Sequence, residues 1–202
     1  MKIITYCEIL DVIKNYISVE IFDRLNKKNI ENVDALLIPK SSVNFAYDLI
    51  YELGPKVSNV EFLSNIPKNN SESLDFFNNH NIEYFRTRTI LLIDSILDSG
   101  YTLNLIVQKL KELDINNLIT CTLIKKDRKD KVCCFDNTDH IFGFQISDYF
   151  VVGYGLDYEE KFRNIKNIFD YNEIKTYLNE KSINSFYEFS NSLEGEKNLN
   201  VR

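Results

Sequence analysis

An alternation of buried strands and one helix between residues 89 and 124 constrains the fold more than any other feature of this sequence. TILLID (89–94) and NLITCTLI (117–124) are short apolar runs typical of buried strands, and YTLNLIVQKLKEL (101–113) between them has helical periodicity. Two such strands joined through a helix form a parallel pair with a right-handed crossover. The segment therefore predicts the centre of an α/β domain.

The flanking segments extend this pattern. Periodicity and turn signals predict helices at 6–27, 43–52 and 171–180, strands at 33–39, 59–63, 139–144 and 149–154, and one helical turn at 73–77 in a long polar loop. No internal repeat is visible. We therefore expect one α/β domain over residues 1–182, with a central, mainly parallel sheet flanked by helices. Residues 183–202 are predicted to be a polar tail that frays.

Charge and cysteine content disfavour several classes of function. Lys+Arg 24 against Asp+Glu 30 gives a net charge of −6, which argues against general nucleic-acid or anionic-membrane binding. Glu8 and Asp11 interrupt the apolar stretch that a signal peptide needs, and no run approaches the roughly 20 apolar residues that span a bilayer. The four cysteines, of which Cys133 and Cys134 are adjacent, form no CxxC pair, and no zinc site has convincing spacing. A reduced cytoplasmic protein is expected.

The turn that follows the strand at 89–94 has the chemistry of a phosphate site. In an open α/β sheet, ligands bind where a strand ends, and the N–H groups and dipole of the next helix favour an anion. Gly100 allows close approach of the backbone, and Ser99 and Thr102 add hydroxyl donors. The turn is neither a Walker A loop nor a Rossmann fingerprint. Asp-Ser-Gly by itself is more typical of an ordinary capped turn.

The full pattern is more specific, and it resembles the phosphoribosyl-diphosphate (PRPP) binding motif of type I phosphoribosyltransferases. That motif has four apolar residues, two acids, two apolar residues and then Asp-Thr/Ser-Gly-x-Thr/Ser. In this chain it reads ILLI, Asp94, Ser95, Ile96, Leu97, Asp98, Ser99, Gly100, Tyr101, Thr102. Ser95 departs from the motif, because it replaces the second acid.

A second resemblance narrows the family. FGFQISDYFVVGYGLDYEEKFRNIKNI (142–168) is similar to the segment that characterises hypoxanthine-guanine phosphoribosyltransferases, and TLIKK (122–126) resembles the strand-end lysine motif upstream of it. Both occur in the family's order and at its spacing. The chain is therefore identified as a diverged member of this family, whose fold adds a small hood region to the parallel sheet.

The resemblance implies a purine salvage enzyme. Such an enzyme transfers 5-phosphoribose from PRPP to a 6-oxopurine such as hypoxanthine or guanine, releases pyrophosphate and uses Mg²⁺. The implied ligands are PRPP and a purine base or nucleoside monophosphate, and the implied assembly is a homodimer or homotetramer.

The resemblance also implies roles for individual residues. Asp98 would be the general base beside N7 of the purine, and Lys125 would donate to its 6-oxo group. The other implied roles are PRPP and ribose binding by Asp94, Ser95, Ser99, Gly100, Tyr101 and Thr102; purine contact by Phe150 and Val151; pyrophosphate binding by Lys40, Ser41 and Arg163; and magnesium binding by Asp157 and Asp94. Without the resemblance, Lys125 would be a solvated charge and Phe150 and Val151 would be core residues.

Three departures from the family pattern favour a different reading. Ser95 brings no charge, the stretch at 39–42 (Pro-Lys-Ser-Ser) lacks the glycines of the family's pyrophosphate loop, and the stretch at 64–72 lacks the Ser-Tyr pair of its lid. These changes are compatible with a regulatory protein that binds a nucleotide or PRPP with little turnover. The retained Asp98 and Arg163 favour the enzyme, and the preferred purine stays open.

Overall fold

A five-stranded parallel sheet forms the centre of the computed structural model, which describes residues 3–63, 82–129 and 140–193. Its strands are β2 (Val33–Leu37), β3 (Val57–Phe62), β4 (Ile90–Leu97), β5 (Leu118–Asp127) and β6 (His140–Ser147). They lie in the order β3-β2-β4-β5-β6, and all four pairs are parallel. The predicted α/β fold with a parallel sheet is therefore confirmed.

The strand order reverses between β2 and β4. β2 pairs with β3 on one side and with β4 on the other, with Leu37 opposite Ile93 in the second pair. The connections that leave these two strands therefore diverge, and a crevice opens at their carboxyl ends. In open α/β sheets this switch point is the usual ligand-binding position.

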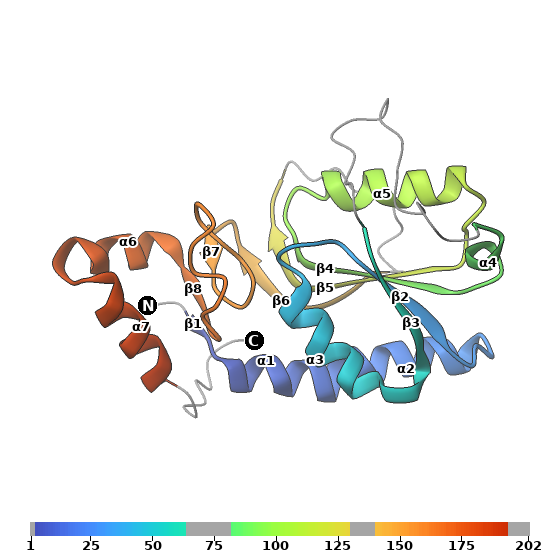
Figure 1. The fold of residues 1–202 in the computed structure, drawn as a ribbon, viewed down its shortest axis with the longest axis horizontal. Helices are drawn as coiled ribbons and strands as arrows, with labels where there is room; N and C mark the ends of the chain where they lie inside the picture. Colours follow the sequence, from blue (N-terminus) through green and yellow to red (C-terminus); the bar gives the residue numbers. More distant parts are fainter. Residues whose placement is uncertain (1–2, 64–81, 130–139, 194–202) are drawn as a thin grey trace.

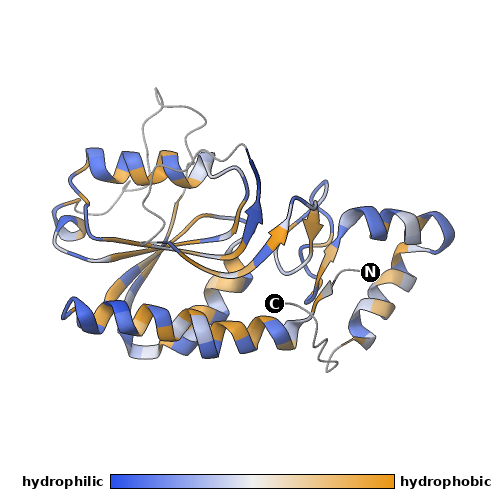
Figure 2. Ribbon diagram, turned by 180° about the vertical axis from the view of Figure 1, so that it is seen from behind, coloured by the Kyte–Doolittle hydropathy of each residue, from blue (hydrophilic) through white to orange (hydrophobic). Residues whose placement is uncertain are grey.

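Helices cover both faces of the sheet, as Figure 1 shows. One face packs against α3 (Val43–Leu53) and a continuous helix made of α1 (Tyr6–Val12), a π-helical turn (Ile13–Ile17) and α2 (Ser18–Lys27). The other face packs against α4 (Ile82–Arg86) and α5 (Tyr101–Glu112). Hydrophobic and hydrophilic segments alternate along these helices (Figure 2), as expected when one side of each faces the sheet. Within the described residues, no helix has the length and hydrophobicity needed to cross a membrane.

A smaller antiparallel sheet lies beyond one end of the large sheet (Figure 1). Its strands are β1 (Ile3–Ile4), β8 (Ile168–Asp170) and β7 (Val151–Val152), in that order. A hairpin of α6 (Tyr171–Glu180) and α7 (Ile183–Ser192) follows β8. This unit corresponds to the predicted hood. The sequence did not predict β1, β8 or α4, because elements of two to five residues are too short to show a period.

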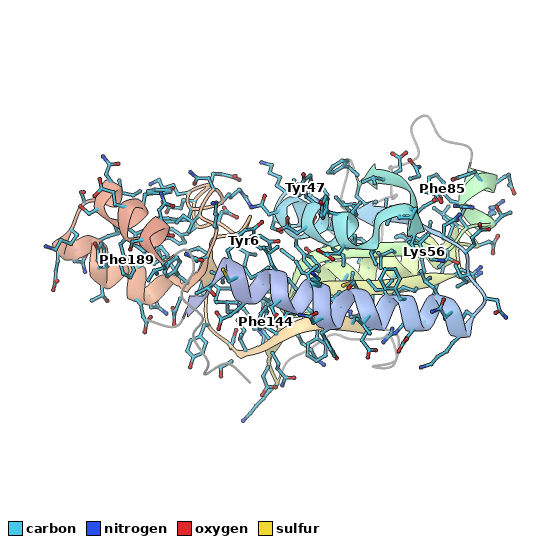
Figure 3. The ribbon with its side chains drawn as sticks, turned by 90° about the horizontal axis from the view of Figure 1, so that it is seen from below. Tyr6, Tyr47, Lys56, Phe85, Phe144 and Phe189 are labelled. Atoms are coloured by element: carbon cyan, nitrogen blue, oxygen red, sulfur yellow. The ribbon has the colours of Figure 1, made fainter. Side chains whose placement is uncertain are left out.

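The prediction of a polar tail is wrong for residues 183–192, which form α7. Phe186 is fully buried, and its ring centroid lies 5.2 Å from that of Phe169 in β8. Phe189, labelled in Figure 3, packs beside Tyr177 of α6. The apolar positions 186, 189 and 193 form a helical stripe that the surrounding Asn and Ser residues conceal.

Some predicted features lie outside the described residues. These are the lid stretch 64–72, the helical turn at 73–77, the adjacent Cys133 and Cys134, and the end of the tail at 194–202. Cys7 and Cys121 are described, and both are free thiols.

Candidate active site

A pocket of about 300 Å³ lies at the switch point of the large sheet. It is lined by Ile38, Pro39 and Ser41, which follow β2, and by Asp94 and residues 96–103, which lead from β4 into α5. The predicted phosphate cradle therefore opens onto the crevice that the strand order creates.

The cradle is built on the first turn of α5. Gly100 precedes the helix in a left-handed conformation with φ of 83°, which glycine adopts without strain. The N–H of Tyr101 donates to Ser99 Oγ at 3.3 Å. Ser99 thus accepts from the first residue of α5 and also lines the pocket, whereas Gly100, the N-cap residue, provides no side-chain cap. The first-turn N–H groups and the helix dipole favour an anion here.

Asp94 is a buried carboxyl on the wall of this pocket. The sequence places it at the end of a strand, whereas β4 continues to Leu97, so Asp94 and Ser95 lie within the strand. Burial raises the pKa of Asp94 to about 7, although the N–H of Ser95 donates to its Oδ1 at 2.7 Å. The side chain can therefore bind a cation in its ionised form or donate a hydrogen bond to a ligand oxygen in its protonated form.

The carboxylates partly fit a magnesium ion. The described residues contain no group of three His, Cys, Asp or Glu side chains placed to hold a metal. Asp157 lies 2.8 Å from the Arg163 guanidinium and accepts the N–H of Glu160. Of these two predicted ligands, Asp94 lines the pocket and Asp157 does not, and Mg²⁺ is commonly held by one or two carboxylates together with substrate phosphates.

Asp98 is the centre of an ion-pair network. Its Oδ2 lies 2.8 Å from Nζ of Lys126, and its Oδ1 lies 2.8 Å from Nη1 of Arg128. Asp148 Oδ1 lies 3.5 Å and 3.4 Å from the same two cations. Lys126 is only 5% exposed, and a buried ammonium requires such partners. The network therefore fixes the position of the Asp98 carboxylate.

Lys126, rather than the predicted Lys125, faces Asp98. Nζ of Lys125 lies 4.5 Å above the centre of the Phe142 ring instead. The side chains of Leu123 and Ile124 both join the core cluster under α1–α3, so the alternation of β5 slips by one residue before the two lysines. Adjacent lysines cannot be told apart by sequence pattern, and Arg128 lies in a charged run that resembles solvated surface.

Two of the predicted pyrophosphate-binding residues contact the same acid, Glu160, for which the sequence pattern predicted no role. Nζ of Lys40 lies 3.7 Å from Glu160 Oε1, and Nη2 of Arg163 lies 3.0 Å from Glu160 Oε2. The Arg163 guanidinium, assisted by Lys40, lowers the pKa of Glu160 below its usual range. An anion thus already sits between these two cations. The peptide bond between Pro39 and Lys40 is cis.

Phe150 is close in sequence to Asp148 of the ion-pair network, and part of its ring is exposed. It follows Asp148 by two residues and is 47% exposed, while Tyr158 and Tyr171 contact its ring edge-on at 5.8 Å and 5.7 Å. Its carbonyl accepts the N–H of Tyr171, and Val151 pairs with Asp170 in the small sheet. The ring is therefore held by its neighbours while nearly half of its surface stays open.

The segment that carries Arg163 packs tightly against the stretch 39–42. Gly155 has a φ of 97°, and a Cβ added to it would lie 2.2 Å from the carbonyl oxygen of Ser41. Nη1 of Arg163 donates to the carbonyl of Gly155 at 2.8 Å. These contacts bring residues far apart in the sequence to one side of the pocket.

Gly155→Ala is therefore expected to destabilise the protein strongly. Positive φ and backbone overlap together should reduce the free energy of unfolding by about 3 kcal/mol or more. Gly54→Ala is the matched control, because Gly54 also has positive φ but has nothing within 4 Å of an added Cβ, and it should cost about 1–2 kcal/mol. Urea denaturation followed by circular dichroism measures both. Equal losses of unfolding free energy in the two variants would show that the Ser41 carbonyl moves away from the added Cβ at no cost.

Comparison with known proteins supports one family. A family model described as "Phosphoribosyl transferase domain" matches residues 7–159. A hypoxanthine phosphoribosyltransferase of Haemophilus influenzae is 27% identical over 146 residues, which cover 69% of this chain and 77% of that protein. A hypoxanthine-guanine phosphoribosyltransferase of Bacillus subtilis is 40% identical over 81 residues, but this match spans only 43% of its length.

Solved structures share the fold. A Trypanosoma cruzi hypoxanthine phosphoribosyl transferase superposes with a TM-score of 0.67 at 24% identity and covers 87% of this chain and 95% of its own. A hypoxanthine-guanine phosphoribosyltransferase from Schistosoma mansoni, solved in complex with IMP, gives a TM-score of 0.62 at 21% identity over 82% of this chain and 77% of its own. Since the family model covers more than half of the sequence, this chain belongs to the phosphoribosyl transferase domain family.

Proposed function

We propose that this protein transfers 5-phosphoribose from PRPP to a 6-oxopurine and releases pyrophosphate. The observation that carries the proposal is the pocket itself, in which Ser41 after β2 meets Asp94, Asp98 and the α5 N-terminus at the switch point. The relatives named as hypoxanthine or hypoxanthine-guanine phosphoribosyltransferases supply the substrate class.

Three side chains recognise the purine: the carboxylate of Asp98, the ammonium of Lys126 and the ring of Phe150. Asp98 accepts a hydrogen bond or proton from N7, and a carboxylate with about four lone-pair sites can do so while two cations hold it. Lys126 has donors only, so it favours a 6-oxo group over the 6-amino group of adenine. The exposed face of Phe150 stacks on the base.

PRPP spans the rest of the pocket. Its 5-phosphate binds the N–H groups and hydroxyls of Ser99 to Thr102, with Tyr101 contributing its backbone. As the C1–O bond breaks, negative charge grows on the pyrophosphate, and Lys40 and Arg163 stabilise it once Glu160 gives way. Asp94 would hold Mg²⁺ from the pocket wall, and Asp157 would join it only after leaving Arg163. The ion would supply neutralisation of the phosphate charge.

The test is a direct assay. The full chain is incubated with PRPP, Mg²⁺ and hypoxanthine, guanine, xanthine or adenine, and the nucleoside monophosphate and pyrophosphate are quantified. Product from at least one 6-oxopurine and none from adenine supports the proposal. Nucleotide binding without product from any base would favour the regulatory alternative. The departures from the family pattern at Ser95 and at the serines 41–42 are compatible with that alternative.

The assembly and compartment are also proposals. Val43, Tyr47 and Tyr51 lie four residues apart on α3, and the two tyrosines are 71% and 76% exposed. Such an aromatic stripe is typical of a surface that a second copy covers. Light scattering should report a dimer or tetramer that Tyr47→Ser/Tyr51→Ser weakens, and a monomeric wild type would contradict this. The free Cys7 and Cys121 are compatible with a cytoplasmic protein.

A further inference from the structure

Two departures from the family pattern meet in the structure. Ser95 stands where the motif has its second acid, and Ser41 stands where the pyrophosphate loop has a glycine. The Oγ of Ser95 donates to the Oγ of Ser41 at 2.8 Å. The two residues are 54 positions apart in the sequence, so only the pairing of β2 with β4 brings them together.

The surroundings favour a neutral hydroxyl at position 95. Ser95 is 2% exposed and directly follows Asp94, whose carboxyl is itself buried. A second carboxylate, as in the family motif, would lie beside Asp94 in a poorly solvated position and would need a bound cation to balance the two charges. A glycine at position 41 would in turn leave the Ser95 hydroxyl without this acceptor. Ser41 thus provides the acceptor that the buried Ser95 hydroxyl needs, and Ser95 provides a neutral donor to Ser41.

Ser41 also connects the pocket to the segment that carries Arg163. Its carbonyl oxygen contacts Gly155 so closely that a Cβ there would lie 2.2 Å away. Arg163 is bound to the same Gly155 through the carbonyl at 2.8 Å. A shift of Ser41 would therefore displace both a wall of the pocket and the support of a cation.

We propose that Ser95 is a positioning residue for Ser41, which it holds in place to bind a phosphoryl oxygen of the diphosphate. Ser41 accepts the hydrogen of Ser95, so its own hydrogen stays available for a phosphoryl oxygen in the pocket. The inference rests on the proposed function, because it assumes that the pocket binds the diphosphate of PRPP.

A double-mutant cycle tests the pair. Ser41→Ala, Ser95→Ala and the double variant are titrated calorimetrically with magnesium pyrophosphate and with PRPP. Loss of one net hydrogen bond should weaken binding about fivefold in each single variant. The double variant should be no weaker than Ser41→Ala, because the 2.8 Å bond to Ser41 is shorter than the other contact of the Ser95 hydroxyl, with Asp94 Oδ1 at 3.4 Å. GMP affinity, which depends on the purine side as well, should change less than pyrophosphate affinity.

Ser42→Ala provides the matched control. Ser42 is a buried neighbour in the same loop, but its Oγ donates to the carbonyl of Ile38. Its effect should add to that of Ser95→Ala without coupling. Urea denaturation of every variant establishes that differences in binding are not losses of folding.

The outcomes are distinct. Additive effects of Ser41→Ala and Ser95→Ala, or a Ser95→Ala variant with unchanged pyrophosphate affinity, would overturn the inference. A wild type that binds neither pyrophosphate nor PRPP would overturn it as well. If the variants show the coupling but the wild type makes no nucleotide, the role of the hydroxyl pair is supported and the proposed turnover is refuted.

Discussion

Replacing Asp98 with asparagine is expected to lower kcat for nucleotide formation by about a hundredfold or more, the usual contribution of a general base. The amide keeps the size of the side chain but cannot accept the proton at N7. GMP affinity should stay within about threefold of the wild type, since most ground-state contacts remain. Single-turnover kinetics and calorimetric titration with GMP measure the two quantities.

The control for this variant is Asp148→Asn. Asp148 faces the same Lys126 and Arg128 but does not line the pocket, so its loss removes the same unit of charge from the network without removing the base. Its kcat should fall less than tenfold. Comparable losses in both variants would show that Asp98 acts by balancing charge, and full activity in Asp98→Asn would remove it from the reaction.

Replacing Lys126 with methionine is expected to reduce kcat/KM for 6-oxopurines by about a hundredfold, which corresponds to about 2.7 kcal/mol. The variant loses the donor that we assign to the 6-oxo group and the partner of Asp98 Oδ2. Discrimination against adenine should shrink at the same time, because the donor disfavours a 6-amino group. Steady-state assays with hypoxanthine, guanine and adenine test both effects.

Lys125→Met is the matched control, one position away and with the same change of side chain. Its ammonium contacts the Phe142 ring, so we expect only the small loss of a cation–π contact and a kcat/KM within about threefold of the wild type. A larger effect in Lys125→Met than in Lys126→Met would show that β5 presents the other lysine to the base.

These two lysines illustrate what sequence spacing can decide. The strand at 117–124 and its basic end were predictable, because an apolar run followed by charge is a strand that leaves the core. Which lysine faces the ligand depends on a one-residue slip near Leu123 and Ile124. Such a slip depends on packing against the helices above and below the sheet, so the sequence does not specify it locally.

The other site residues also separate into those that the local sequence could predict and those that it could not. The cradle at Ser99–Thr102 was predictable from local chemistry, because a strand, a turn with glycine and a helix lie next to one another in the sequence. The partners of its acids were not, since Arg128, Asp148 and Glu160 come from different connections. Their charges looked like ordinary solvated surface in the sequence.

By itself, the sequence determined the α/β pattern and the position of the turn that leads into α5, both of which depend on neighbours within about ten residues. The role predicted for Asp98 came from the family resemblance. The tertiary structure decided that Lys126 meets Asp98, that Ser95 bonds Ser41, and that residues 183–192 form α7. The physical reason is that these contacts arise only after β2, β4 and β5 pair, and after Phe186 finds a core to enter.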